Sequence, residues 1–208
     1  MNFIKSMGYD IFSDNLSKIE LTDKCKVLST ISPNSYAIAE KDSVFKKSLL
    51  NSDFIVLDGV YFGLAAILTQ RKIIKTNNGP SVYDFFIKKM NRQKGRVFFL
   101  GSNQETLGKI KSRLNSEYPD VFANFFSPPF KTNFSESENK EIITTINNFK
   151  PDIVFVGMTC LDRSESSSTV SGSFDPLIER LRSLRKSDCS VLIDLKMLLI
   201  DSSGLFSR

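Results

Sequence analysis

The 208-residue sequence contains no histidine, no tryptophan and only three cysteines. Without histidine, the chain lacks the side chain most often used as a metal ligand and as a general base near neutral pH. Cys25, Cys160 and Cys189 are odd in number and widely spaced, which matches neither a disulfide framework nor a Cys-x-x-Cys metal pair. We therefore expect no metal site, and we expect carboxylates to carry any acid or base chemistry.

Long hydrophobic runs are also missing. No stretch of about 18 uninterrupted apolar residues could span a bilayer, and the first residues lack the apolar core of a secretory signal. A cytoplasmic location is the expectation. Lys and Arg exceed Asp and Glu by 28 to 23, giving a formal net charge of +5, which mildly favours an anionic partner without choosing among phosphates, nucleic acid and membrane.

Apolar runs alternate with segments of helical periodicity over most of the chain. This order predicts a Rossmann-like α/β fold, with a mostly parallel sheet and helices on both faces, in one domain of ordinary size. Capping-box spacing at Ser102 and Glu105, and again at Ser135 and Glu138, indicates two helix starts. The expected strands are 27–31, 54–57, 97–100 and 153–156, and the expected helices are 34–50, 60–68, 81–91, 104–116 and 135–149.

Asp58 follows the apolar run 54–57 directly and precedes Gly59. Open α/β sheets bind ligands in the crevice outside the carboxyl ends of their strands, so Asp58 is a candidate for a carboxylate that faces a substrate. The competing interpretation is an ordinary Asp-Gly turn. Likewise, Gly101 and Ser102 between a strand and a helix could cradle a phosphate at the helix N-terminus, or could be only a tight turn.

The composition changes after Cys160. Residues 164–173 include six serines and are typical of a linker. Residues 177–186 could form a basic amphipathic helix on an anionic membrane, or a solvated charged helix. Residues 191–200 are apolar enough for a strand or a helix, with no partner that the sequence identifies.

Six short motifs follow one another along the chain. They are Thr30-Ile31-Ser32-Pro33-Asn34, Asp58-Gly59-Val60-Tyr61, Gly79-Pro80-Ser81, Phe98-Phe99-Leu100-Gly101-Ser102, Glu117-Tyr118-Pro119 and Pro151-Asp152 to Met158. Their order resembles that of the WecG/TagA/CpsF family of bacterial glycosyltransferases, over about residues 8–160. Four positions depart from the family pattern. Ser32 stands where an Asn is usual, Tyr61 where a second Gly is usual, and Ser81 where an Asp is usual. Thr76 replaces a basic residue, although Lys75 is adjacent.

The resemblance implies a UDP-sugar-dependent enzyme of cell-surface polysaccharide synthesis. It would transfer an N-acetylhexosamine-type sugar, ManNAc or ManNAcA-like, to a polyprenyl-diphosphate-linked acceptor. It would act without metal or cofactor, as a peripheral protein at the inner face of the bacterial membrane, and the resemblance leaves a homo-oligomer open. Asp58 would be the general base, with Thr30 orienting the sugar. The implied substrate-binding residues are Ser32, Asn34, Gly59, Lys75, Gly79, Gly101, Ser102 and Gly157.

The resemblance stops at Cys160. The family continues Pro-Lys/Arg-Gln-Glu, whereas this chain continues Leu161-Asp162-Arg163-Ser164. One added C after a TGC codon for Cys160 would convert a possible coding sequence of this stretch into Cys-Pro-Arg-Gln-Glu-Arg-Ile. We therefore expect an incomplete glycosyltransferase-like domain over 1–160 and an out-of-frame Ser-rich, basic tail over 161–208. Loss of later elements would leave one side of the sheet uncovered.

Two other functions remain as alternatives. One is a non-catalytic nucleotide-binding remnant of the same family. The other is a basic nucleic-acid binder, which is suggested only by the net charge and by the basic residues 180–186, and which lacks a recognisable motif. We therefore expect no nucleic acid among the partners.

Overall fold

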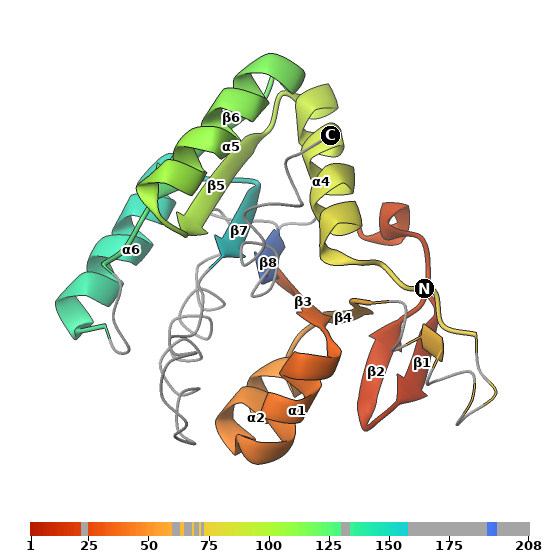
Figure 1. The fold of residues 1–208 in the computed structure, drawn as a ribbon. Helices are drawn as coiled ribbons and strands as arrows, with labels where there is room; N and C mark the ends of the chain where they lie inside the picture. The colour runs from red at the N-terminus through yellow and green to blue at the C-terminus, as the bar shows by residue number, and fades with distance from the viewer. Residues whose placement is uncertain are drawn as a thin grey trace.

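The computed structural model describes residues 1–21, 25–59, 63–64, 68, 71, 73–129, 134–157 and 191–194 (Figure 1). Strands and helices alternate along most of this length. The strands are β1 (Phe3–Ser6), β2 (Tyr9–Phe12), β3 (Lys26–Ile31), β4 (Phe54–Leu57), β5 (Arg96–Gly101), β6 (Phe122–Phe126), β7 (Ile153–Gly157) and β8 (Val191–Asp194). The helices are the 3₁₀ turn η1 (Leu16–Lys18), α1 (Pro33–Lys41), α2 (Ser43–Leu50), α4 (Gly79–Gln93), α5 (Gln104–Glu117) and α6 (Glu136–Phe149).

All eight strands form one sheet, in the order β1-β2-β4-β3-β8-β7-β5-β6. Every neighbouring pair is parallel except β1 and β2, which form an antiparallel hairpin at one edge. The carboxyl ends of the parallel strands therefore meet along one edge of the sheet. The predicted mostly parallel α/β fold is confirmed.

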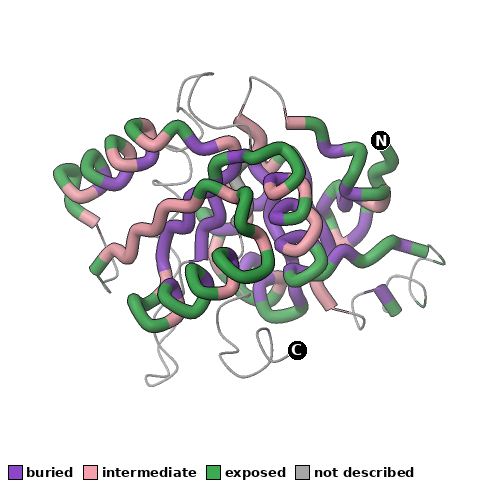
Figure 2. The backbone as a smooth tube through the Cα atoms, turned by 90° about the horizontal axis from the view of Figure 1, so that it is seen from above, coloured by how far each residue is buried: buried purple, intermediate pink, exposed green. Residues whose placement is uncertain are grey.

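Helices cover both faces of the sheet (Figure 1). One face packs against α4 and α5, and the other against α1, α2 and α6. Figure 2 shows buried backbone through the middle of the molecule and exposed backbone along the outer sides of the helices. Each helix is thus held by one apolar stripe, as expected for amphipathic helices on a sheet.

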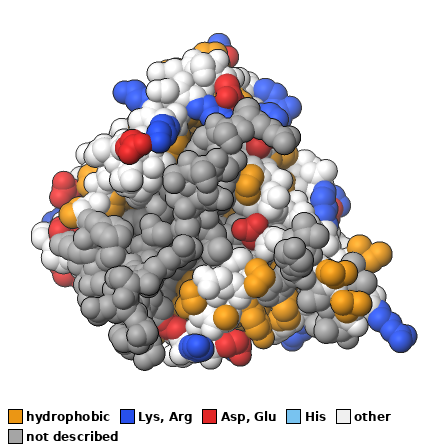
Figure 3. Space-filling view, viewed as in Figure 1, with side chains coloured by type: hydrophobic (Ala, Val, Ile, Leu, Met, Phe, Trp, Pro, Cys, Tyr) orange, Lys and Arg blue, Asp and Glu red, His pale blue; other side chains and the backbone are white. Residues whose placement is uncertain are grey.

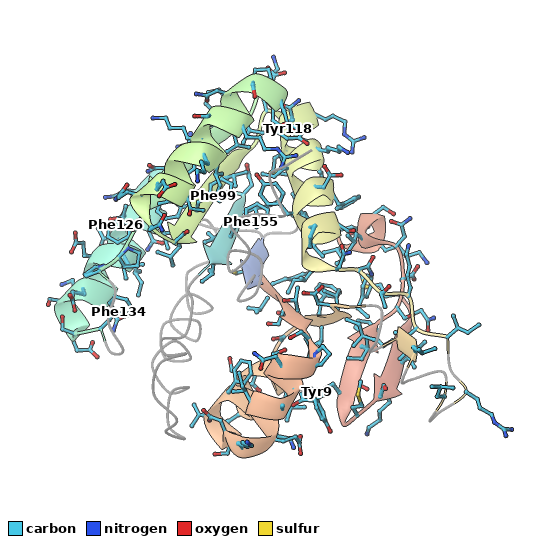
Figure 4. The ribbon with its side chains drawn as sticks, viewed as in Figure 1. Tyr9, Phe99, Tyr118, Phe126, Phe134 and Phe155 are labelled. Carbon is cyan, nitrogen blue, oxygen red and sulfur yellow. The ribbon has the colours of Figure 1, made fainter. Side chains whose placement is uncertain are left out.

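Aromatic rings fill the core between β5, β6 and β7. The Phe99 ring stacks on Phe155 with centroids 5.4 Å apart and on Phe125 with centroids 5.2 Å apart. Phe99 and Phe155 come from neighbouring strands and point to the same side of the sheet (Figure 4). Stacked aromatic pairs add stabilisation beyond the apolar area that they bury, so these rings anchor this half of the sheet.

The single helix predicted over residues 34–50 is wrong, because the chain forms α1 and α2 with a break at Asp42. The Asp42 carboxylate accepts hydrogen bonds from the backbone N–H groups of Val44 at 2.8 Å and Phe45 at 3.1 Å. An Asp side chain that binds nearby backbone donors competes with helix continuation and favours a helix start. The apolar spacing alone could not reveal this break.

One of the two predicted capping boxes is also wrong. The cap of α5 is Asn103, whose side chain accepts from the N–H of Thr106 at 2.7 Å, and Ser102 lies outside the helix. The box at Ser135 and Glu138 is confirmed at the start of α6. The hairpin β1–β2 and the strand β6 were not expected from the sequence. The helix expected over 60–68 lies mostly outside the described residues.

β8 occupies the centre of the sheet, between β3 and β7. Leu192 pairs with Val27 on one side and with Val154 on the other. The sequence identified no partner for residues 191–200, whereas the structure gives the strand 191–194 two partner strands. Because this strand lies within 161–208, part of the expected tail takes part in the fold.

Replacing Ile193 with proline tests how much β8 contributes to the stability of the fold. Proline removes a ladder N–H and does not fit the middle of a sheet, so Ile193→Pro should lower the free energy of unfolding by roughly 3 kcal/mol. Chemical denaturation measures this change. Ile193→Val keeps the backbone donor and is the control. Equal stability of the proline variant and the wild type would show that 191–194 is dispensable.

Candidate active site

The carboxyl ends of the parallel strands bring most of the candidate residues to one edge of the sheet. Asp58 follows β4, Ser32 follows β3, and Gly101 and Gly157 end β5 and β7. Such edges are where open α/β sheets bind their ligands. Because β3, β4, β5 and β7 belong to one parallel series, these four residues lie at the same edge of the sheet.

Asp58 is held where β4 leaves the sheet. Its backbone N–H donates to the carbonyl oxygen of Ile31 at 2.9 Å, which extends the β3–β4 ladder by one step. Its carboxylate accepts a hydrogen bond from the backbone N–H of Gly79, the first residue of α4. Backbone from two elements therefore positions this side chain.

Burial raises the pKa of the Asp58 carboxyl above its ordinary value, and the hydrogen bond from Gly79 opposes that shift without cancelling it. Desolvation disfavours the charged form of a carboxyl group, whereas a donor to the carboxylate favours it. The result is a half-buried carboxyl group that takes up a proton more readily than an exposed aspartate does. This property suits a general base.

Gly59 turns the chain away from the sheet directly after Asp58. Its φ of +103° lies in the region that L side chains rarely adopt, and a Cβ atom built there would lie 4.0 Å from Cδ of Pro33. The turn therefore requires glycine for its backbone angle rather than for space. Pro33 is the first residue of α1, so the N-termini of α1 and α4 both lie close to the Asp58-Gly59 turn.

Thr30 and Ser32 flank the end of β3, and both are buried. Thr30 pairs with Val56 in the ladder, two residues before Asp58. The Ser32 hydroxyl accepts from the N–H of Ser35 at 3.2 Å, and the Ser35 hydroxyl accepts from the N–H of Ser32 at 2.7 Å. Ser32 thus caps α1, a structural role that the sequence interpretation missed. Asn34, in the first turn of α1, is exposed.

Gly79 was expected to contact substrate, but the structure gives it another partner in Asp58. Asn78 caps α4 by accepting from the N–H of Ser81 at 3.0 Å, which leaves the Gly79 N–H for the carboxylate. The sequence signal for this arrangement was Asn followed by Gly and Pro, since proline favours the first turn of a helix. Lys75 is exposed, and its backbone N–H donates to the Ser13 hydroxyl at 2.8 Å, beyond the end of β2.

Gly101 and Ser102 form a second group of candidates, together with Gly157. Gly101 and Gly157 are paired in the β5–β7 ladder. Gly101 has φ +104° and Ser102 has φ +64°, and the Ser102 carbonyl accepts from the Ser127 hydroxyl at 2.6 Å. A non-glycine residue in the left-handed region carries strain of the kind often found at functional sites. This turn precedes the N-terminus of α5.

The two groups are separated along the edge. From β4 to β5 the sheet takes four steps, through β3, β8 and β7, or about 19 Å at roughly 4.8 Å per step. Thr30 and Gly157, on β3 and β7, are two steps apart, or about 10 Å. A compact ligand cannot contact both Asp58 and the Gly101 turn, whereas an elongated ligand that lies along the edge can.

The residues that the structure describes outline a pocket of about 630 Å³ at the amino ends of the strands, lined in part by Lys89, Arg96 and Asp152. Two of its charged residues, Arg96 and Asp152, form hydrogen bonds that join elements. The Asp152 carboxylate accepts from the Arg96 N–H at 2.8 Å, and Arg96 Nε donates to the Phe149 carbonyl at 2.8 Å. We assign this pocket no role in catalysis. Within the described ranges, no group of three His, Cys, Asp or Glu side chains could hold a metal ion.

The sequence model of the "Glycosyl transferase WecG/TagA/CpsF family" matches residues 4–165. The chain belongs to this family. The match begins in β1 and runs past the end of β7, so it includes Asp58 and both groups of candidate residues. The family prediction made from the short motifs is confirmed.

Curated relatives within the WecG/TagA/CpsF family are distant in sequence. The chain is 26% identical over 148 residues to a Bacillus subtilis (strain 168) protein named N-acetylglucosaminyldiphosphoundecaprenol N-acetyl-beta-D-mannosaminyltransferase, covering 71% of this chain and 56% of that protein. It is 21% identical over 184 residues to the Staphylococcus aureus (strain NCTC 8325 / PS 47) protein of the same name, covering 83% of this chain and 69% of that protein. The chain thus spans little more than half the length of the Bacillus relative.

Two departures from the WecG/TagA/CpsF pattern can be placed in the structure. Ser81 lies in the first turn of α4, where its N–H is bound by Asn78. Thr76 lies in the extended segment before α4. Tyr61 and the residues that follow Gly157 up to 190 lie outside the described residues. The structure describes no helix of the length and apolarity that a bilayer crossing requires.

Asp58→Asn should leave the protein at least as stable as the wild type at neutral pH. A carboxyl group whose pKa is raised by folding binds its proton more tightly in the folded state than in the unfolded state. Its contribution to folding stability is therefore fully present below its ordinary pKa of 3.8 and is lost as the pH rises through the raised pKa. The stability gap in favour of the Asn variant should therefore grow with pH over this window. Thermal melts at a series of pH values measure it.

Asp14→Asn is the control of opposite sign. The Asp14 carboxylate accepts from Lys18 and from the N–H groups of Asn15 and Asn2, and these bonds lower its pKa. Its stabilisation is present above the ordinary value and is lost on acidification. Asp14→Asn should therefore be less stable than the wild type at neutral pH and equal to it in acid. Parallel curves for both variants would contradict the assigned environments.

Proposed function

We propose that this chain is a glycosyltransferase that moves an N-acetylhexosamine-type sugar, ManNAc or ManNAcA-like, from a UDP-sugar to a polyprenyl-diphosphate-linked acceptor. The observation that carries the proposal is the half-buried Asp58 carboxyl group at the carboxyl edge of a parallel sheet, with its raised pKa. Family membership supports the class of reaction. The names of the curated relatives, as mannosaminyltransferases acting on an undecaprenol-linked sugar, support the substrate class.

Asp58 acts as the general base in this proposal. An acceptor hydroxyl attacks the anomeric carbon of the donor, the new glycosidic bond forms, and the bond to UDP breaks with its electron pair on the departing phosphate oxygen. The hydroxyl proton passes to the Asp58 carboxylate. The Gly79 N–H fixes one carboxylate oxygen, and correct placement of a base against the reacting hydroxyl is worth as much as its pKa.

The donor extends along the sheet edge in this proposal. The turn at Gly101 and Ser102 precedes the N-terminus of α5, where unpaired N–H groups and the helix dipole favour a diphosphate. Thr30, near Asp58, orients the sugar, and Gly157 allows close approach of the donor between the two groups. The remaining substrate contacts fall to Ser32, Asn34, Gly59, Lys75 and Gly79.

The acceptor determines where the protein works. A polyprenyl-diphosphate-linked sugar is held in a bilayer by its lipid, so the enzyme acts as a peripheral protein at the inner face of the cell membrane. The net charge of +5 favours contact with an anionic surface. A homo-oligomer is compatible with this arrangement.

Asp58→Asn should reduce transfer by about 10²- to 10⁴-fold, the usual contribution of a general base, while UDP binding is retained. Calorimetric titration with UDP and a turnover assay with UDP-ManNAc measure both properties. In the wild type, kcat/KM should fall on acidification with an apparent pKa above the ordinary carboxyl value of 3.8, because burial raises the pKa of Asp58.

Asp84→Asn is the matched control. Asp84 is half-exposed on α4, about one turn beyond the helix start that holds Asp58. It pairs with Lys88 at 2.7 Å and accepts from the Tyr118 hydroxyl at 3.3 Å. Its turnover should stay within about twofold of the wild type, as expected for a surface ion pair of small energetic weight. Equal turnover by Asp58→Asn and Asp84→Asn would remove Asp58 from the mechanism.

The second candidate function is a non-catalytic nucleotide-binding remnant. It is favoured by the departure of the sequence from the Pro-Lys/Arg-Gln-Glu pattern directly after Cys160. UDP binding without turnover, unchanged in Asp58→Asn, would favour this function. The DNA after the Cys160 codon tests the frameshift. A shifted frame that encodes Pro-Arg-Gln-Glu supports it, and the absence of such a frame contradicts it.

A further inference from the structure

Exposed aliphatic and basic side chains gather at the outer end of the sheet edge that carries Asp58. We call Met1, Leu68, Arg71, Ile73 and Lys75 the apolar–basic rim. Ile73 is 83% exposed, Leu68 74% and Met1 61%, the three highest values among the large exposed hydrophobic residues. Arg71 and Lys75 flank Ile73 and are also exposed. Figure 3 shows hydrophobic side chains gathered over the region of β1 and β2, with Lys or Arg side chains projecting beside them.

Hydrogen bonds of Ser13 connect the N-terminal part of the rim to Lys75. The Ser13 N–H donates to the Asn2 carbonyl at 3.0 Å, and the Ser13 hydroxyl accepts from the Lys75 N–H at 2.8 Å. Met1 and Lys75 therefore lie on either side of Ser13. A Cβ atom on Gly63 would lie 3.0 Å from the Thr76 methyl, so Gly63 packs directly on the segment 73–78 that carries Ile73.

The rim lies at the same edge as Asp58. Ser13 follows the carboxyl end of β2, and β2 is the direct neighbour of β4. Leu68, Arg71 and Ile73 lie in the sequence between Gly59, which follows Asp58, and Gly79, whose N–H binds the Asp58 carboxylate. The rim segment is thus anchored at both ends beside the candidate base.

Charge and apolarity together indicate the kind of surface that fits the rim. Highly exposed aliphatic side chains flanked by cations are typical of segments that insert into the headgroup layer of anionic bilayers. The nearest described carboxylate on the Ser13 segment, Asp14, is neutralised by Lys18 at 2.7 Å and by N–H donors. The rim therefore presents net positive charge around its apolar side chains.

We propose that the apolar–basic rim docks on the surface of an anionic lipid bilayer and brings the Asp58 edge of the sheet to the membrane interface. The inference deepens the proposed function, because a lipid-linked acceptor presents its sugar at that interface. The rim is distinct from the basic residues 177–186. Its occupant is the lipid surface itself, with no requirement for a partner protein.

Vesicle flotation with the full-length protein tests the docking. Wild type should bind phosphatidylglycerol-containing vesicles, with weaker binding at high salt and on pure phosphatidylcholine. Leu68→Glu/Ile73→Glu should weaken binding at least tenfold. Arg71→Gln and Lys75→Gln should each weaken it about fivefold, as expected for one cation near an anionic surface. These positions are exposed, so unchanged thermal melts are expected and show that each variant is folded.

Phe122→Glu is the control. Phe122 is 59% exposed and lies on β6, at the opposite edge of the sheet from β1. It should bind vesicles as the wild type does. Failure of wild type to bind anionic vesicles, or equal binding by the wild type and the Leu68→Glu/Ile73→Glu variant, would overturn the proposal. Wild-type dimers that the rim variants dissociate, without any vesicle binding, would assign the rim to a second copy of the chain instead.

Two acceptors separate this inference from the proposed function. With an acceptor in vesicles, the Leu68→Glu/Ile73→Glu and Arg71→Gln variants should lose turnover, whereas with a short-chain acceptor in solution these two variants should match the wild type. Loss with both acceptors would count against a docking role. If the wild type turns over neither acceptor, the proposed function fails, and the flotation result still decides whether the rim binds the bilayer.

Discussion

The sheet is continuous because β8 hydrogen-bonds to β3 on one side and to β7 on the other. Without these two ladders, the strands β1-β2-β4-β3 and β7-β5-β6 would be two separate halves. Each half would expose an unpaired parallel edge, and such edges promote aggregation. The two groups of candidate site residues belong to different halves, so β8 also sets the distance between Asp58 and the Gly101 turn. Four residues from the C-terminal part of the chain therefore support both the fold and the site.

The environment of Asp58 suits the proton transfer that we propose for it. Burial at the end of β4 raises its pKa, while the Gly79 N–H supplies one oriented donor. The ionised form is desolvated at a cost to stability, which is a common price of functional groups in folded proteins. The left-handed backbone at Ser102 adds local strain at the same edge. A desolvated carboxyl group and a strained turn therefore both lie where the ligand is expected.

The two edges of the sheet differ in character. At the amino edge, Arg96 and Asp152 form hydrogen bonds that join β5, α6 and the start of β7. At the carboxyl edge, helix N-termini, a half-buried carboxyl group and an exposed apolar–basic rim meet around the ends of β2, β4 and β3. A parallel sheet creates this asymmetry, since every strand delivers its following residue to the same side. Chemistry and membrane contact can thus be served by one edge.

The sequence by itself determined the alternation of strands and helices, the family, and the place of Asp58 after a buried strand, because these depend on local apolar periodicity and short motifs. It could not determine that Asp42 splits one helix into two, or that Asn103 rather than Ser102 caps α5, because neighbouring polar side chains compete for the same donors. Only the tertiary structure brought Gly79 to Asp58 and placed β8 at the centre of the sheet. These contacts join residues far apart in the chain, and no local pattern records which distant backbone groups will pair.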